Sequence, residues 1–171
     1  MPSKTIFVPC EEYPYASQTE VLKPGMEVLE ISTRSKVPFG KSLSPFNLVI
    51  TLKSGKRVKV ECTYQGSKVL ADSKQYIGLY WRSPRDAALD KRIKGQRPVG
   101  FRFFGKEYTT TPKHAFFDFL YIVGLCQRKD DVFGKLDTWD GFSDMFYSPR
   151  KDPNCRFNPK LVRLEAESLC A

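Results

Sequence analysis

The sequence predicts a single α+β domain with a small antiparallel sheet in its N-terminal third. The chain has 171 residues, and one hydrophobic core typically serves roughly 100–200 residues. Two runs of alternating apolar and polar residues flank a glycine-containing turn, and segments with helical periodicity follow them. We therefore expect one domain over 1–171, with an N-terminal extension over 1–25 and a core over 26–171.

The N-terminal third is expected to contain strands. In "GMEVLEIST", apolar Met26, Val28 and Ile31 alternate with polar neighbours, which is typical of a short half-buried strand. The segment "NLVITLKSGKRVKVEC" consists of two alternating runs about a turn at 53–56. This pattern predicts a β-hairpin.

Two helices are expected after the hairpin. The first covers about 62–71 and follows the second run of the hairpin directly. In the second, over 83–95, Ser83 can cap the helix, Pro84 suits its first position and Gly95 suits its end.

The clearest helix is "PKHAFFDFLYIVGLCQRK", which follows a short expected strand, "PVGFRFFGKEYT". Phe116, Leu120 and Val123 recur at helical spacing, and Phe117 and Tyr121 widen the apolar face, so this helix is expected to lie in the core.

The remaining sequence divides into a polar stretch, "LDTWDGFSDMFYSPRKDPNCRFNP", and a final amphipathic helix, "PKLVRLEAESLC". A loop of that length is uncommon in a compact domain unless it is functional or disordered. Its aromatic residues argue against disorder, so we expect it to form part of a site.

Positive charge is clustered along the chain. The net charge is +9, from 28 basic and 19 acidic residues. Such clusters attract nucleic acid or phosphorylated ligands, although a solvated basic surface remains an alternative. The clusters comprise Lys53, Lys56, Arg57 and Lys59; Arg82, Arg85, Lys91, Arg92, Lys94 and Arg97; and Arg150, Lys151, Arg156, Lys160 and Arg163.

Composition argues against several classes of protein. There is no apolar run of about 20 residues to span a membrane, and the N-terminus has no apolar signal region, so we expect a cytoplasmic protein without a membrane partner. The five cysteines are scattered without a C-x-x-C pair, and His114 is the only histidine. Neither a disulfide framework nor a metal site is indicated, and no cofactor is expected.

A polar stripe stands out in the first expected helix. Glu61, Gln65 and Lys68 are spaced i, i+4 and i+7, on one helical face. Because buried, unpaired charges are costly, the face is either exposed, with an ion pair, or the wall of a pocket. Val69 and Leu70 are the main apolar residues elsewhere on the helix, and this shortage favours the pocket wall.

The stripe lies in "ECTYQGSKVL", which resembles the E-x-x-x-Q-x-x-K signature of the NADAR superfamily, proteins linked to NAD and ADP-ribose metabolism. Further segments resemble, in the same order, the NADAR antitoxins paired with DarT-type DNA ADP-ribosyltransferases. The resemblance covers roughly 28–170, and these segments are "LEISTRS…FGKSLSPFNLVI", "RSPRDAALDKRI", "GFRFFGKEY…P…AFFDFLY" and "FSDMFYSPRKDPNC".

This resemblance implies a predominantly helical α+β domain of the YbiA-like kind that removes ADP-ribose from modified guanine in DNA. Its partners would be ADP-ribosylated DNA, ADP-ribose as product and, functionally, a DarT-type toxin that it opposes as antitoxin or phage counter-defence factor. The reaction breaks an N-glycosidic C–N bond, which requires a carboxylate and a proton donor.

The resemblance also implies roles for particular residues. Lys68 is the expected reacting group, by Schiff base or as a proton donor, with Glu61 orienting it or moving protons and Asp144 activating water. Hydroxyl, amide and guanidinium groups suit ribose and diphosphate, and aromatic rings suit a base. The expected substrate-binding residues are Arg34, Ser35, Ser44, Phe46, Asn47, Gln65, Trp81, Trp139, Phe142 and Asn154.

Two positions depart from the family pattern. Cys62 stands where many relatives carry histidine, and Phe146, in "SDMFYSP", stands where the antitoxin-like motif T-D-I-E-F-N-P has glutamate. If that glutamate is catalytic in the antitoxins, this protein either uses Glu61 and Asp144 instead or has altered activity. Two other functions remain open: an N-glycosidase of a riboflavin-pathway intermediate, and a non-catalytic module that binds ADP-ribose or nucleic acid.

Overall fold

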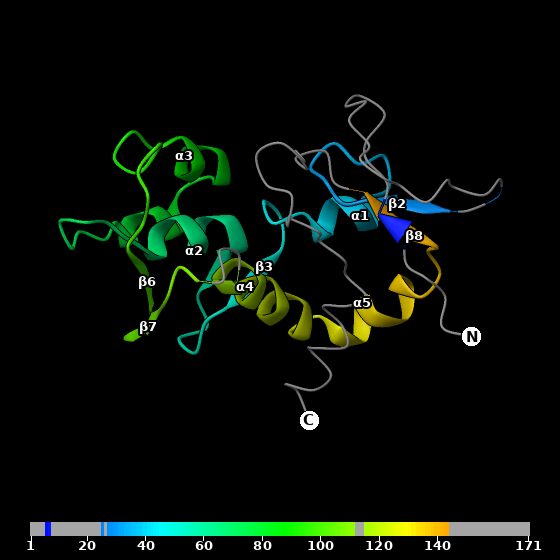
Figure 1. Ribbon diagram of the computed structural model, residues 1–171. Coiled ribbons are helices and arrows are strands. Elements are labelled where there is room, and N and C mark those ends of the chain that lie inside the picture. Colours follow the sequence, from blue (N-terminus) through cyan, green and yellow to red (C-terminus); the bar gives the residue numbers. More distant parts are fainter. Residues whose placement is uncertain (1–5, 8–24, 26, 112–114, 144–171) are drawn as a thin grey trace. The chain divides into compact units, whose positions relative to one another are not determined.

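Helices and short strands are interspersed along the described chain, and this mixed composition confirms the α+β prediction (Figure 1). The structure is a computed structural model, and it describes residues 6–7, 25, 27–111 and 115–143. The predominance of helix and the boundaries of a single domain stay predictions. The expected final helix, His114, and the polar stretch beyond residue 143 lie outside the described residues.

The chain divides into two compact units, which we call the terminal unit (1–44 and 128–171) and the central unit (45–127). The terminal unit contains a three-stranded sheet in which β8 (Gly141–Ser143) pairs in parallel with both β1 (Ile6–Phe7) and β2 (Val28–Glu30). The assignment of 141–143 to an irregular stretch was wrong. Strand β8 pairs with residues from the other end of the sequence, and no local pattern indicates such a pairing.

Helix α1 (Pro38–Leu43) packs closely against β2 at Gly40. Proline occupies the start of the helix, where its missing N–H costs no hydrogen bond. A Cβ on Gly40 would lie 2.1 Å from the Glu30 backbone oxygen and 2.9 Å from Leu29 Cδ1. Packing therefore requires glycine at this position.

We expect Gly40→Ala to destabilise the protein by about 2 kcal/mol, because the atom in the way is backbone and cannot turn aside. Gly134→Ala is the matched control, since that helical glycine has nothing within 4 Å of an added Cβ. The control should be neutral or stabilising by up to about 1 kcal/mol. Urea unfolding midpoints measure both effects, and equal midpoints for the two variants would contradict the packing argument.

Helix α5 (Lys129–Leu136) completes the described part of the terminal unit and was not expected from the sequence. Its buried side chains are Val132 and Leu136, a spacing too sparse to give a clear helical period. Charge stabilises it instead: Asp131 in the first turn forms ion pairs with Arg128 and Lys135.

The central unit begins with an antiparallel pair, β3 (Val49–Thr51) and β4 (Arg57–Lys59), in which Ile50 lies opposite Val58. The N–H of Leu52 donates to the Lys56 carbonyl at 2.8 Å across the turn. Strand β4 passes directly into helix α2 (Val60–Ser67). The hairpin thereby fixes where the polar residues of α2 begin.

The helix expected over 62–71 ends earlier than predicted, at Ser67. Residues Lys68–Val69 form strand β5 and pair antiparallel with β6 (Gly100–Phe103). The prediction of a helix through Ala71 was wrong because the chain gains this strand pairing, a tertiary interaction that helical periodicity cannot indicate. Lys68 therefore lies just beyond the helix and not on its face.

Helix α3 (Pro84–Leu89) confirms the expected start, since the Ser83 hydroxyl accepts a bond from the Asp86 N–H at 3.1 Å. The expected end at Gly95 was wrong. Asp90 accepts bonds from the backbone N–H and guanidinium of Arg92, and this local turn replaces the next helical turn.

Three further elements complete the central unit: the 3-10 helix η1 (Ile77–Trp81), strand β7 (Lys106–Tyr108) and helix α4 (Ala115–Cys126). The single strand expected over 98–109 is a hairpin of β6 and β7, and η1 was not expected. Helix α4 is a core helix, as expected, with Phe116 and Leu120 buried. Helices α2 and α3 lie side by side (Figure 1).

Candidate active site

Helix α2 carries a buried polar pair. Glu61 lies in its first turn and Gln65 one turn later, and each is only 9% exposed. Gln65 Nε2 donates to Glu61 Oε1 at 2.7 Å. The amide fixes the orientation of a carboxylate that the helix has removed from bulk water.

Lys68 approaches this pair from strand β5. Its side chain is half-buried, its Nζ lies 4.9 Å from the centroid of the Tyr64 ring, and its charge interacts with Glu61. Among the residues that the structure describes, Lys68 makes no ion pair within 4.0 Å. Strand β5 thus supplies an ammonium beside the carboxylate, although the three residues do not share one helical face.

Burial disfavours the charged form of both groups. Burial raises the pKa of Glu61 above its usual 4.5, although the hydrogen bond from Gln65 and the charge of Lys68 oppose the shift. Burial lowers the pKa of Lys68 below its usual 10.5, against the opposing effect of the Glu61 charge. A protonated carboxyl and a neutral amine are therefore more accessible here than in water, and these are the forms that general acid and nucleophilic chemistry need.

Aromatic rings surround the lysine end of the site. The Tyr64 ring lies 5.4 Å from Phe101 and 5.2 Å from Phe117, between ring centroids, and Phe101 stacks on Phe116 at 4.5 Å. Of these rings, Tyr64 lies beside the Lys68 ammonium, whose pKa is lowered by burial. The sequence placed Phe116 and Phe117 in the core, but it did not indicate that their helix would back the lysine.

Cys62 faces the core. It packs with Leu70 and Leu79, and its Sγ donates to the Arg82 carbonyl at 3.3 Å. Burial raises its pKa to about 11, with a further contribution from the Glu61 charge. The thiol stays protonated near neutral pH, so it is a structural group and not a nucleophile.

The other candidates in the central unit are Phe46, Asn47 and Trp81. Phe46 and Asn47 are half-buried just before β3. Trp81 is 55% exposed and lines a cavity whose walls include neither Glu61 nor Lys68.

The candidates in the terminal unit have mixed surroundings. Arg34 is exposed, whereas Ser35 is buried in the turn before α1, where its hydroxyl accepts from the Val37 N–H. Ser44 is buried at the end of α1. Trp139 is half-buried, and Phe142 is 1% exposed, so a base could stack on Phe142 only after the strand moved. Asp144 and Asn154 lie outside the described residues, and their roles stay predictions.

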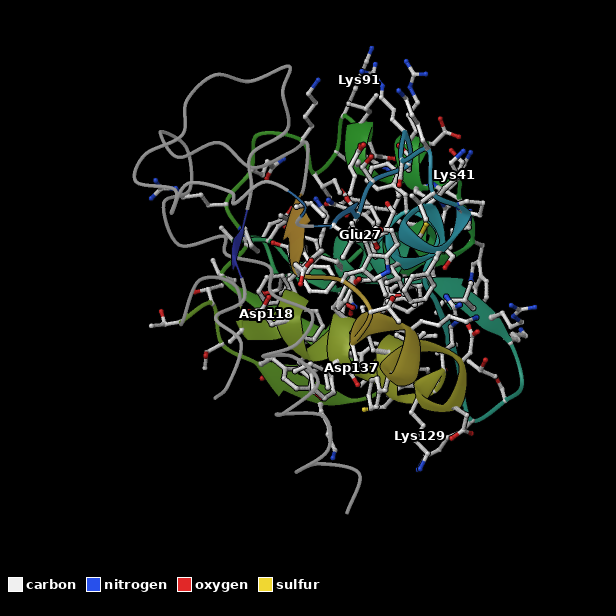
Figure 2. The ribbon with its side chains drawn as sticks, turned by 90° about the vertical axis from the view of Figure 1, so that its right-hand side faces the viewer. Glu27, Lys41, Lys91, Asp118, Lys129 and Asp137 are labelled. Carbon is white, nitrogen blue, oxygen red and sulfur yellow. The ribbon has the colours of Figure 1, made fainter. Side chains whose placement is uncertain are left out.

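The basic clusters differ in their surroundings. Lys53, Lys56 and Arg57 are exposed on the β3–β4 hairpin, and Lys91, labelled in Figure 2, extends away from the ribbon after α3. The positive charge of Arg92 is partly compensated by its ion pair with Asp90. The third cluster lies beyond residue 143, outside the described residues.

Two further properties concern the described residues alone. They contain no group of three or more His, Cys, Asp or Glu that could hold a metal ion. None of their helices has both the length and the apolar character needed to cross a membrane.

Comparison with known proteins identifies a family for this chain. A family model described as the DarT1-associated NADAR antitoxin matches residues 6–159. No curated protein matches the chain. The matched range includes every residue that the sequence singled out for the site.

Proposed function

The chain belongs to the family of DarT1-associated NADAR antitoxins, and on that premise we propose that it is a hydrolase that removes ADP-ribose from ADP-ribosylated guanine in DNA. The enzyme would cleave the N-glycosidic bond between ribose C1″ and guanine nitrogen. The observation that carries the proposal is the Lys68 amine, whose pKa burial lowers, beside the buried carboxyl of Glu61.

The reaction begins with ring opening. Glu61 in its protonated form donates a proton to the ribose ring oxygen, the C1″–O4″ bond breaks, and C1″ becomes an iminium bonded to the guanine nitrogen. Gln65 holds the Glu61 carboxyl through its 2.7 Å bond. The raised pKa of Glu61 keeps a proton available for this step.

The Lys68 nitrogen then replaces the guanine nitrogen at C1″. Its neutral amine adds to the iminium carbon, a proton passes from Lys68 nitrogen to guanine nitrogen, and restored guanine leaves. The product is a Schiff base between Lys68 and C1″. Water adds to this imine, the adduct collapses to the sugar aldehyde, which closes to ADP-ribose, and the Lys68 amine is regenerated.

The remaining proposed roles concern binding and water. Asp144 would activate the attacking water as the second carboxylate, together with the Glu61 carboxylate left after proton donation. The groups proposed to hold ribose, diphosphate and base are those expected from the sequence except Trp81, which lines a separate cavity, and Arg34 supplies the cation for diphosphate. No cofactor enters this scheme.

The test is to incubate the protein with DNA that carries ADP-ribosylated guanine and to measure both free ADP-ribose and restored base. We expect both products in equal amounts. Binding without release would favour the non-catalytic module. Cleavage of a riboflavin-pathway intermediate, with no release from DNA, would favour the small-molecule N-glycosidase.

The activity should depend on pH through both groups of the site. We expect a bell-shaped profile of kcat/KM, because the reactive form of the pair has a proton on Glu61 and none on Lys68. Since the pKa of Glu61 is raised from 4.5 and that of Lys68 is lowered from 10.5, both limbs should lie between these two ordinary values. In Glu61→Gln, the residual activity should keep only the limb that rises with pH. That limb should also move to higher pH, because it then reports the loss of a proton from Lys68 alone, whereas the first proton lost by the wild-type pair can come from either group. A profile identical to that of the wild type would remove Glu61 from the reaction.

A further inference from the structure

We propose that a cavity in the central unit binds an unmodified nucleobase of the single DNA strand that carries the reacting guanine. The choice of DNA as ligand rests on the proposed function. The cavity has a volume of about 360 Å³ and does not include Glu61, Gln65 or Lys68 among its walls. It is therefore a separate subsite, and Trp81 belongs to it rather than to the reacting centre.

Exposed aromatic rings line the cavity. Trp81 on η1 is 55% exposed, Phe104 on the β6–β7 turn is 62% exposed, and Ile77 lies beside them at 61%. Rings of this kind provide faces on which any base can stack, so proteins that bind single strands use them as platforms. The rings of a base-paired duplex are already stacked and could not enter.

The backbone holds Phe104 in the solvent at a conformational cost. Phe104 and Gly105 both have positive φ, 49° and 74°, in the two-residue turn between β6 and β7. Asparagine followed by glycine suits such a turn, whereas an aromatic residue does not. The ring packs edge-to-face on Phe103, at 4.6 Å between ring centroids, but most of its surface is exposed, and a ligand that stacks on that surface explains why phenylalanine stands there.

Positive charge accompanies the rings. Lys56 Nζ lies 5.3 Å from the centroid of the Trp81 ring, and Lys56 forms no ion pair with any described residue. Arg102 also lines the cavity, although Glu107 partly neutralises it. The ammonium lies over one face of the Trp81 ring, so a base would stack on Phe104 or on the other face of Trp81, with its phosphate at the ammonium. This arrangement favours nucleic acid over a protein partner.

The cavity is tied to the residues around Lys68. Gln75 Nε2 donates to the Gly66 carbonyl at 3.1 Å and to the Arg102 carbonyl at 2.7 Å. Arg102 directly follows Phe101, whose backbone pairs with that of Lys68. Neighbouring residues of a strand point to opposite faces, so Arg102 in the cavity and Lys68, which lies opposite Phe101, are on different faces of this sheet. The cavity would therefore take a nucleotide further along the strand than the one at Lys68.

The test measures binding of a fluorescein-labelled, unmodified oligothymidine of about 12 nucleotides by anisotropy, a length within the usual range for such surfaces. Trp81→Ala and Phe104→Asn should each weaken binding about 10-fold. Phe104→Asn should also keep or raise Tm, because asparagine accepts positive φ, so its loss of affinity cannot result from unfolding. Lys56→Ala should reduce the salt slope by about one unit.

Matched controls lie elsewhere on the surface. Leu89→Ala removes an apolar side chain that is 49% exposed and outside the cavity, and Lys129→Ala removes an exposed ammonium that points away from α5 (Figure 2). Both should bind the oligothymidine as the wild type does. An abasic strand of the same length should bind about as weakly to the wild type as oligothymidine binds to Trp81→Ala.

Equal affinities for the abasic strand and oligothymidine would overturn the proposal, as would wild-type affinity in both Trp81→Ala and Phe104→Asn. If these variants bind DNA normally but no longer protect cells from a DarT1 toxin, the cavity belongs to a protein partner. These binding results do not depend on turnover. Hydrolysis of an ADP-ribosylated guanosine should be unchanged in both variants, and its absence in the wild type would instead overturn the proposed function.

Discussion

Lys68→Ala is expected to lower the rate of ADP-ribosyl-guanine hydrolysis at least ~100-fold, the usual scale for an acid–base group and a lower bound for a nucleophile. The fold should persist, because the ammonium is half-buried without an ion-pair partner among the described residues, and its removal relieves a desolvation cost. Product release measured with excess DNA and circular dichroism of the same preparation check both expectations. Lys74→Ala, which removes an exposed lysine paired with Asp72, is the control and should be fully active.

A Schiff base at Lys68 can be tested directly by chemical trapping. Borohydride added during turnover should reduce the imine and leave an adduct of ADP-ribose mass on the wild type, located at Lys68 by peptide mass spectrometry. Lys68→Ala should give no adduct. Lys68→Arg keeps a positive charge but has no amine that can lose its proton, so it should also be inactive.

Each alternative role of Lys68 has its own result. An active Lys68→Arg without a trapped adduct would reduce Lys68 to an electrostatic group. Full activity of Lys68→Ala would remove the residue from the reaction and leave the polar pair of α2 as part of the structure alone.

The sequence predicts residue types in this site better than it predicts their placement. Glu61 and Gln65 were correctly expected on a common helical face, since their spacing depends only on local geometry. Lys68 was placed on the same helix because periodicity continues through it, yet its backbone pairs with Phe101, about 30 residues along the chain. The lysine reaches the pair from a strand, and the aromatic cluster that contains Tyr64 is built from α2, β6 and α4.

The same distinction holds for the fold. The cap at Ser83 and the turn between β3 and β4 follow from neighbouring residues and were predicted. Strand β8 and helix α5 depend on distant partners or sparse burial, and they were missed. The backbone conformation of Phe104 was also missed. Phenylalanine rarely adopts positive φ, so the sequence did not indicate that this residue would lie in the turn between β6 and β7.

Glu61→Gln is expected to separate activity from stability. The amide cannot donate a proton as a carboxylic acid does, so hydrolysis should fall by about 100-fold or more. In contrast to hydrolysis, the free energy of unfolding should increase near neutral pH. The folded-state pKa of Glu61 is raised, so Glu61 contributes most stability below its unfolded value of 4.5 and loses that contribution as pH rises through the folded pKa.

Glutamine has no ionisation to oppose, and its side-chain oxygen can still accept the bond from Gln65 Nε2. The Tm of Glu61→Gln should therefore exceed that of the wild type at neutral pH, and the difference should vanish as the pH falls below about 4. Glu107→Gln, at an exposed carboxylate that pairs with Arg102, is the control and should leave hydrolysis unchanged. A lower Tm together with normal hydrolysis would assign Glu61 to folding, because a carboxylate that stabilises the fold and does no chemistry would produce that pattern.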